Sequence, residues 1–308
     1  MIDSRVKFRH LQTFVEVARQ KSVMKAAELL NVSQPAVTKT IRELEEVLGV
    51  AVFERDGRGI KITRYGDVFL RHAGAALTAL RQGLDSVSQE RFGEAPPIRI
   101  GALPTVSTRI MPRAMELFLK ENTWSRIKIV TGENAVLLEQ LRVGDLDLVV
   151  GRLAGAEKMA GFSFEHLYSE QVVFAVRAGH PLLKSRQSLF AKLSEYTVLM
   201  PTRASIIRPF VESFLIANGV ASLPNQIETV SDSFGRAFVR SSNAIWIIST
   251  GVVATDIADG LLEVLPIDTS ETKGPVGLTM RTDAIPSLPL SILMQTLREA
   301  AAEVAVKT

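Results

Sequence analysis

Residues 33–39 read Ser-Gln-Pro-Ala-Val-Thr-Lys, and this short segment decides how the first part of the chain folds. Ser33 is of a residue type that caps helices, because its hydroxyl accepts a hydrogen bond from a free backbone N–H of the first turn. Pro35 fits that turn, where a missing N–H group is no loss. Gln34 and Lys39 project polar groups from the start of the helix. The segment therefore predicts a helix that begins at Ser33 and presents polar side chains at its tip.

Two predicted helices precede this one. Apolar residues recur at helical spacing over residues 10–20, and a second helix follows its cap at Ser22. Residues 31–32 form a short turn into the next helix, which keeps an apolar stripe as far as Gly49. This order and this turn length are typical of a helix-turn-helix, whose last helix enters the major groove of DNA.

A predicted β-hairpin follows the third helix. Residues 50–53 and 60–63 are short strand candidates, and the residues between them include basic side chains and the turn dipeptide Asp56-Gly57. A hairpin with basic residues at its tip predicts a wing beside the helix-turn-helix. We assign residues 1–66 to a winged helix-turn-helix domain.

The basic charge of the chain is concentrated in this first domain. Residues 1–66 hold 12 Lys or Arg and 8 Asp or Glu, whereas the remaining 242 residues hold 24 and 25. A basic head on a near-neutral body fits a nucleic-acid-binding protein. The 308 residues include no cysteine, no apolar run typical of a signal peptide and no stretch of membrane-spanning length. We therefore expect a cytoplasmic protein of two or three domains that does not enter a membrane.

The sequence from Tyr65 onward predicts a long helix. Its apolar residues occupy two heptad positions, with Leu70, Leu77 and Leu84 at one and Ala73, Leu80 and Val87 at the other. Such a repeat predicts contact with the same helix of a second chain, and the alternative is a helix packed on its own body. Polar residues 89–97 end in Ala-Pro-Pro, which predicts a helix end and a hinge. We assign residues 67–95 to this linker helix and hinge.

Strands and helices alternate in the rest of the chain. The predicted strands are residues 98–102, 127–130, 146–151, 172–177, 197–200, 226–230 and 244–249. The predicted helices are residues 110–121, 135–143, 207–218 and 288–304. This order predicts a parallel sheet covered by helices, so we assign residues 96–308 to the α/β class.

Together these motifs resemble the LysR-type transcriptional regulators. The resemblance rests on residues 33–45 (Ser-Gln-Pro-Ala-Val-Thr-Lys-x-Ile-Arg-x-Leu-Glu), followed by residues 48–55 and 63–66, and it continues at residues 141–148 and 177–182. Two further stretches resemble family members that control protocatechuate catabolism. They are residues 8–14 (Phe-Arg-His-Leu-Gln-Thr-Phe) and residues 130–134 (Val-Thr-Gly-Glu-Asn).

The resemblance implies an architecture. A winged helix-turn-helix would be joined by the linker helix to an effector domain of two α/β lobes, similar to type 2 periplasmic binding proteins, with the ligand between the lobes. Lobe I would comprise about residues 96–165 and 268–308, and lobe II about residues 166–267.

The resemblance also implies partners. Family members commonly assemble as tetramers, as dimers of dimers, on an interrupted dyad site in double-stranded promoter DNA, and RNA polymerase is a further implied partner. The implied effector is β-carboxy-cis,cis-muconate, and the implied output is activation of protocatechuate-degradation genes. Regulation of sugar-uptake or sugar-metabolism genes by a sugar is the alternative.

The predicted DNA contacts lie on the third helix and on the hairpin. They are Ser33, Gln34, Pro35, Thr38, Lys39, Arg42, Arg55 and Arg58. Gln34 can pair bidentately with adenine N6 and N7, and its alternative role is that of a helix-capping amide. Pro35 either touches a thymine methyl group or only starts the helix. Lys39 stands where many relatives have arginine, so bidentate guanine reading gives way to a phosphate contact.

The basic residues of the hairpin and of the third helix are expected in roles that do not read a particular base. Arg58 is expected in the minor groove or on a phosphate. Arg42, Arg55 and Lys61 are expected on phosphates or in ion pairs within the domain, and a solvated surface position is the alternative for each of them.

The predicted effector contacts lie in turns that follow strands, the usual binding edge of an open α/β sheet. They are Pro104, Thr105, Ser107, Thr131, Asn134, Pro201, Thr202, Arg203 and Ser231. Free N–H groups and hydroxyls there can hold a carboxylate, although each Ser or Thr has an alternative role as an ordinary helix cap. Arg203 is predicted to supply the positive charge that binds an anionic effector, because a buried anion needs donors that offset its desolvation.

Three charged residues near these turns complete the prediction. Arg109 and Arg208 are second choices for the cation, and the alternative for each is an exposed position on a helix. Glu133 would repel an anionic effector, so we expect it to point away or to cap the helix that begins at Asn134.

The sequence does not support catalysis. The four histidines have no ligand spacing, and no dinucleotide loop, phosphate loop or nucleophile elbow occurs. We therefore expect no enzyme activity, no metal and no cofactor. Two alternatives from other classes stay open. A solute-binding protein would leave residues 1–66 unexplained and would normally need export, and an enzyme with an appended DNA-binding head is also conceivable.

Overall fold

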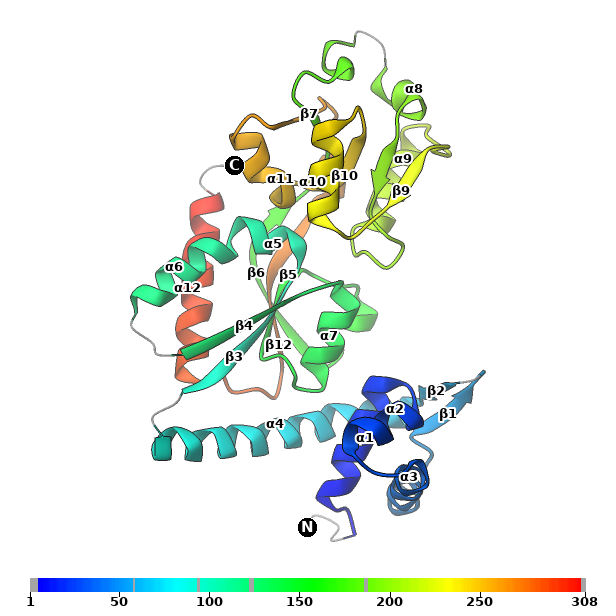
Figure 1. Ribbon diagram of the computed structural model, residues 1–308, viewed down its shortest axis with the longest axis vertical. Helices are drawn as coiled ribbons and strands as arrows, with labels where there is room; N and C mark the ends of the chain where they lie inside the picture. Colours follow the sequence, from blue (N-terminus) through cyan, green and yellow to red (C-terminus); the bar gives the residue numbers. More distant parts are fainter. Residues whose placement is uncertain (1–4, 58, 93–94, 122–124, 186–187, 306–308) are drawn as a thin grey trace.

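Three parts follow one another along the chain in the structure, which is a computed structural model. It describes residues 5–57, 59–92, 95–121, 125–185 and 188–305. A small helical domain with a β-hairpin comes first, a long helix lies across the base of lobe I, and lobe II lies farthest from the first domain (Figure 1). This confirms the predicted winged helix-turn-helix, linker helix and two-lobed α/β domain.

The first domain contains three helices and one hairpin. They are α1 (Phe8–Gln20), α2 (Val23–Leu30), α3 (Gln34–Leu48), β1 (Phe53–Asp56) and β2 (Gly59–Ile62). The hydroxyls of Ser22 and Ser33 accept hydrogen bonds from the backbone N–H groups of Lys25 and Ala36, so both act as the predicted helix caps. Phe14, Val37 and Leu44 are buried where the three helices meet.

The first strand of the hairpin begins later than the predicted 50–53. A carboxylate oxygen of Glu45 accepts hydrogen bonds from the backbone N–H groups of Val52 and Phe53, at 2.8 and 3.4 Å. Val52 is also fully buried in the core of the domain. These contacts hold the segment against α3, so strand pairing starts only at Phe53.

The long helix α4 spans Arg64–Phe92 and has two different halves. Leu70 and Ala73 are buried in the core of the winged helix-turn-helix, which is the predicted alternative of packing on its own body. Leu80, Leu84 and Val87 are 47%, 63% and 65% exposed, so the second half leaves an apolar stripe uncovered. The apolar heptad residues therefore pack within the chain in the first half of α4 and remain exposed in the second half.

Residues 95–97, where a hinge is predicted, lie in a strand of lobe I. The strand β3 spans Ala95–Ala102, and Ala95 pairs with Ser125 of the neighbouring strand. The pairing register shifts between Ala95 and Ile98, which accommodates two prolines that cannot donate to the sheet. The predicted end of the helix within residues 89–97 is confirmed, since α4 ends at Phe92.

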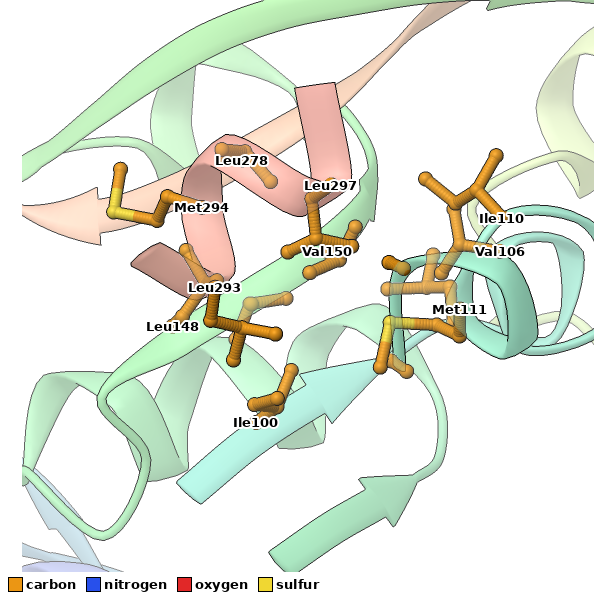
Figure 2. Close-up of a cluster of buried hydrophobic side chains, with 14 of the residues drawn as sticks. Ile100, Val106, Ile110, Met111, Leu148, Val150, Leu278, Leu293, Met294 and Leu297 are labelled. Atoms are coloured by element: carbon orange, nitrogen blue, oxygen red, sulfur yellow. The ribbon is translucent and has the colours of Figure 1, made fainter. Parts of the chain in front are cut away.

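Lobe I holds a five-stranded sheet in the order β4-β3-β5-β12-β6. Its elements are β3, α5 (Pro104–Arg109), α6 (Met111–Lys120), β4 (Ser125–Thr131), α7 (Asn134–Arg142), β5 (Leu148–Arg152), β6 (Phe162–Glu170), β12 (Gly274–Arg281) and α12 (Leu288–Ala305). Figure 2 shows the core, where Ile100, Leu148 and Val150 of the sheet meet Leu293 and Leu297 of α12. Each buried leucine contributes about 1.5–3 kcal/mol relative to an exposed one.

Lobe II holds a second five-stranded sheet in the order β11-β7-β10-β8-β9. Its elements are β7 (Val172–Arg177), α8 (Leu189–Lys192), β8 (Val198–Met200), α9 (Arg208–Ala217), β9 (Gln226–Glu228), α10 (Asp232–Ser241), β10 (Ile245–Ser249), α11 (Thr250–Ala258) and β11 (Leu262–Val264). The chain leaves lobe I at Gln171, between β6 and β7, and returns between β11 and β12. The outward crossing thus lies later than the predicted boundary between residues 165 and 166.

Both sheets are mixed, so the prediction of a parallel sheet holds for only part of each. In lobe I, β3 is parallel to β4 and β5, but β12 is antiparallel to β5 and β6. In lobe II, β7 is antiparallel to β10 and β11. The antiparallel pairs arise because the chain crosses between the lobes twice and inserts β12 into a sheet formed by much earlier residues.

Candidate DNA-binding surface and effector cavity

The exposed face of α3 brings five of the predicted DNA contacts together. One hollow along this helix is lined by Gln34, Pro35, Thr38, Lys39 and Arg42, together with Glu43 and Glu46. Gln34 and Lys39 are exposed, while the Thr38 hydroxyl donates to the backbone carbonyl of Gln34 at 3.1 Å. Gln34 and Lys39 therefore have side chains free to reach outward from the helix tip, and Thr38 sits between them.

Ser33 and Pro35 both help to form the start of α3. The Ser33 hydroxyl caps the helix, and Pro35 occupies its first turn. Pro35 also lines the hollow, so the two roles considered for it are compatible in this structure.

Glu43 is a charged residue of this surface that the sequence analysis missed. Its carboxylate accepts hydrogen bonds from Arg9 at 2.6 Å and lies 3.3 Å from the ring of buried His10. Hydrogen bonds from Arg9 and then His10 lower the pKa of the Glu43 carboxyl. The network ties α1 to α3, and only the packed helices bring these residues together, since they are more than 30 residues apart in the sequence.

The hairpin presents part of the predicted basic wing. Arg55 is exposed on β1 and lies opposite Ile60, and Lys61 is exposed on β2. Gly57 has φ +57°, a left-handed turn conformation that glycine adopts readily. Arg58 lies outside the described residues, so its contact with DNA stays a prediction.

A cavity of about 420 Å³ lies between the lobes, at the ends of strands from both sheets. It is lined by the start of α5, the turn before α7, the turn after β8 and the start of α10. Seven of the nine predicted effector residues line it, namely Pro104, Thr105, Ser107, Thr131, Asn134, Pro201 and Ser231. The strand-end rule therefore located the turns that form this cavity.

Thr202 and Arg203 do not line the cavity. The Thr202 hydroxyl donates to a carboxylate oxygen of Glu133 at 2.9 Å, which joins lobe II to lobe I. Arg203 is exposed, because the turn directs Pro201 and Ser205 inward and leaves the guanidinium in water. The structure thus places the cation chosen from the sequence outside the cavity wall.

Arg152 supplies a cation to the cavity instead. It ends β5, is only 4% exposed and lines the cavity. Its guanidinium donates to the backbone carbonyls of Thr272 and Glu170, at 2.5 and 3.4 Å, and lies over the ring of Phe210 at 4.7 Å. Burial lowers the pKa of Arg152. An arginine at the end of a strand that is otherwise apolar was the sequence signal for this site.

The two second-choice arginines make ion pairs away from the cavity wall. Arg109 donates to a carboxylate oxygen of Glu170 at 3.0 Å. Arg208 is buried and donates to the carbonyl of Pro201 at 2.7 Å and to Glu228 at 2.9 Å. Neither lines the cavity, so neither is placed as the cation for an effector. Neither is the exposed helix residue that was the alternative, because both are held in ion pairs.

Acidic residues form part of the cavity wall. Glu133 lies at the N-cap position of α7 without a side-chain capping bond, and it faces the cavity rather than away from it. Asp232 also lines the cavity, and burial raises the pKa of its carboxyl. A bound anion would therefore be attracted by Arg152 and repelled by Glu133, so its orientation is restricted.

The buried amide of Asn134 is only partly satisfied. Its Nδ2 donates to the carbonyl of Arg152 at 3.0 Å, whereas its Oδ1 is buried without a hydrogen-bond partner in the described part of the chain. A buried acceptor without a partner costs about 1–3 kcal/mol. A ligand that donates a hydrogen bond to Oδ1 would remove this penalty.

Glu170 joins the lobes behind the cavity. One of its carboxylate oxygens accepts from the Thr105 hydroxyl, and the other accepts from the backbone N–H of Gly251 at 2.5 Å. Thr105 belongs to lobe I and Gly251 to lobe II. The Thr105 hydroxyl is therefore engaged by the protein, and the Ser107 hydroxyl donates to the backbone carbonyls of Ala102 and Leu103.

Two other kinds of site are absent from the described residues. No group of three His, Asp or Glu side chains there is arranged to hold a metal ion. No helix within those ranges combines the length and the apolar character needed to cross a membrane.

The chain matches two family models. Residues 8–67 match "Bacterial regulatory helix-turn-helix protein, lysR family", and residues 93–302 match "LysR substrate binding domain". The HTH-type transcriptional regulator PcaQ of Agrobacterium fabrum is 73% identical over 303 residues, which cover 98% of this chain and 97% of that protein. The uncharacterized HTH-type transcriptional regulator YdcI of Escherichia coli is 31% identical and covers 97% of each chain.

Solved structures share the fold of the whole chain. Full-length LysG from Corynebacterium glutamicum, with bound effector Arg, has a TM-score of 0.62 at 18% identity and covers 97% of this chain and 99% of its own. Full-length CbnR in complex with its target DNA has a TM-score of 0.54 at 21% identity, covering 96% and 100%. Both family models match in the expected order, and together they span most of the chain. The protein is a member of the LysR family of transcriptional regulators.

Proposed function

We propose that this regulator activates genes for protocatechuate degradation and that its effector is β-carboxy-cis,cis-muconate. The similarity to PcaQ over nearly the full length supports the choice of target genes. The cavity between the lobes supports a small anionic effector, because its wall contains the buried guanidinium of Arg152. This arginine is the single observation that carries the proposal.

The charge of Arg152 is available to a ligand. Its guanidinium donates to two backbone carbonyls and lies over the ring of Phe210, and within the described residues it forms no salt bridge with a carboxylate. A carboxylate brought to a buried guanidinium makes a charge-assisted hydrogen bond, which is about twice as strong as a neutral one. One carboxylate of the effector is expected at Arg152, and Ser107 lines the same cavity.

A sugar is the second candidate effector. The carboxylates of Glu133 and Asp232 favour it, because they line the cavity and can accept hydrogen bonds from hydroxyl groups. The unpartnered Oδ1 of Asn134 is a further acceptor of this kind. An anionic effector would therefore bind mainly through Arg152, whereas a sugar would bind mainly through the acidic and amide side chains of the wall.

Trp246 offers a direct test of these candidates. It lines the cavity, and the chain has two tryptophans, so the full-length Trp124→Phe protein reports from Trp246 alone. We expect a saturable change of its fluorescence with β-carboxy-cis,cis-muconate and a smaller one with cis,cis-muconate. Saturation by a sugar with no response to the tricarboxylate would reject the proposed effector. A mobility-shift assay with the chain's own upstream DNA tests promoter binding separately.

We further propose that the chain forms a homo-oligomer through the second half of α4, with a tetramer as the expected assembly. The exposed stripe of Leu80, Leu84 and Val87 supports this, because a second copy of the same helix would cover it.

Leu84→Glu is expected to weaken this assembly. A glutamate there would place a charge in the contact between two copies, so a smaller species should dominate when molar mass is measured by light scattering. Gln82→Glu adds the same charge at another exposed position of α4 and serves as the control. Equal molar masses for wild type and Leu84→Glu over a dilution series would contradict the contact.

A further inference from the structure

The turn after α7 packs against the DNA-binding domain of the same chain. Residues 142–145 form this turn, and its Val143 is 4% exposed within the core cluster that contains Phe14 and Leu70. Arg19 at the end of α1 donates to a carboxylate oxygen of Asp145 at 2.7 Å, and Arg81 of α4 donates to the carbonyl of Gly144. Lobe I is therefore attached to both α1 and α4 through one short turn.

Glycines allow this turn to approach α4 closely. A Cβ atom on Gly74 would lie 2.6 Å from the carbonyl oxygen of Arg142, and one on Gly144 would lie 1.9 Å from the Thr78 hydroxyl. Gly144 also has φ +78°, a conformation that other residues rarely adopt. The 142–145 turn and α4 are thus in direct backbone contact, so movement of one displaces the other.

The ion pair between Arg19 and Asp145 is held in a defined setting. Arg19 also donates to Glu16 at 2.6 Å, and Asp145 is half-buried. Burial raises the pKa of the Asp145 carboxyl, although Arg19 and Arg81 beside it lower it. An ion pair that is partly removed from water is stronger than an exposed one and fixes the geometry of its partners.

The same helix that ends in this turn begins at the effector cavity. Asn134 and the preceding Glu133 line the cavity at the start of α7, and Arg142 is both the last residue of the helix and the first of the 142–145 turn. A helix of nine residues is about 13 Å long and moves as a rigid unit. Figure 1 shows α7 on the side of lobe I that faces α1 and α4.

We infer that α7 couples the effector cavity to the DNA-binding domain, and that Asp145 and Arg19 are the residues that position this domain. Ligand contact with Glu133 or Asn134 shifts α7, and the 142–145 turn carries the shift to α1 and α4. This inference rests on the proposed function, because it assigns a consequence to occupation of the same cavity.

Spin-label distances test the positioning role directly. The chain has no cysteine, so Lys25→Cys on α2 and Glu299→Cys on α12 can be labelled selectively at two exposed positions. Labelled chains are diluted with excess unlabelled protein, so that only distances within one chain are measured. We expect one narrow distance distribution for wild type, a broader one for Asp145→Asn, and a shifted one on saturation with β-carboxy-cis,cis-muconate.

The promoter response separates positioning from a general structural effect. Asp145→Asn is expected to retain ligand binding at Trp246 but to reduce the ratio of promoter affinities with and without β-carboxy-cis,cis-muconate by about fivefold. The double variant Arg19→Gln with Asp145→Asn should lose no more of the response than Asp145→Asn alone, because the single variant already breaks the same ion pair. Glu303→Gln removes an exposed ion pair with Arg113, far from the turn, and should respond as wild type.

The outcomes distinguish this inference from the proposed function. If Trp246 does not respond to β-carboxy-cis,cis-muconate, the proposed effector is rejected, and the ligand-free distances still decide whether Asp145 positions the domain. If Trp246 responds but Asp145→Asn shows wild-type distances and a wild-type promoter response, the coupling through α7 is overturned. A loss in the double variant that equals the sum of the two single losses likewise contradicts a role for the ion pair.

Discussion

Replacing Arg152 with glutamine is expected to weaken binding of an anionic effector by about ten- to hundredfold. The guanidinium is the buried cation of the cavity wall, and a hydrogen bond to a charged group contributes about 1.5–3 kcal/mol, with each 1.4 kcal/mol equal to a factor of ten in affinity. Glutamine keeps a donor of similar shape but removes the charge. The effector carboxylate would then be desolvated without a cation. Titration of Trp246 fluorescence in the full-length Trp124→Phe protein measures the loss.

Two further variants make this result specific. Arg203→Gln changes an exposed arginine that does not line the cavity, so it should bind the effector as wild type does. Arg152→Lys keeps a positive charge and should retain part of the affinity. Arg152→Gln should still bind promoter DNA without effector, because Arg152 is in lobe I and the proposed DNA contacts are in the first domain. A loss at Arg203→Gln, with none at Arg152→Gln, would refute the assignment of the cation.

Replacing Gln34 with alanine is expected to remove discrimination at one base pair in each half-site. An amide that pairs with adenine N6 and N7 contributes about 1–3 kcal/mol of discrimination against the wrong base. Gln34 is exposed at the first turn of α3, in the hollow that also contains Lys39. The variant should therefore bind the matched promoter and promoters changed at that one base pair with similar affinities, measured by fluorescence anisotropy, and should still discriminate at the other positions.

Lys39→Ala is the matched comparison on the same helix. Lys39 is expected to contact a phosphate, so its loss should weaken binding to matched and scrambled duplexes alike and reduce the salt dependence of affinity. Gln34→Ala should leave the salt dependence nearly unchanged. Identical behaviour of the two variants on both duplexes would contradict this division into base reading and backbone contact.

Local patterns predicted the first domain well. Helix caps, apolar spacing and turn residues act within a few positions, so Ser33 and Pro35 marked the start of α3 before any contact was known. The exception is the hairpin, whose first strand was placed at 50–53. The hydrogen bonds from Val52 and Phe53 to Glu45 join residues seven and eight positions apart, and no strand pattern contains them.

The sequence predicted which turns form the candidate effector site, but it did not predict which arginine supplies the positive charge there. Parallel strands in an open sheet bring their carboxyl ends to one edge, which is why the turns at Pro104, Asn134 and Ser231 meet at the cavity. Which arginine is buried there depends on how the two lobes pack. Arg152 is enclosed by the Thr272 carbonyl and the ring of Phe210, which come from distant parts of the chain.

The sequence by itself determined the order of the parts, the polar tip of α3 and the turns that surround the cavity, because these follow from interactions between near neighbours. Only the tertiary structure decided that Arg152 rather than Arg203 faces the cavity, that half of the α4 repeat is used within the chain, and that the turn at Asp145 reaches Arg19. Such contacts join residues far apart in the sequence, and the packing that buries a charge or exposes a leucine exists only once the whole chain has folded.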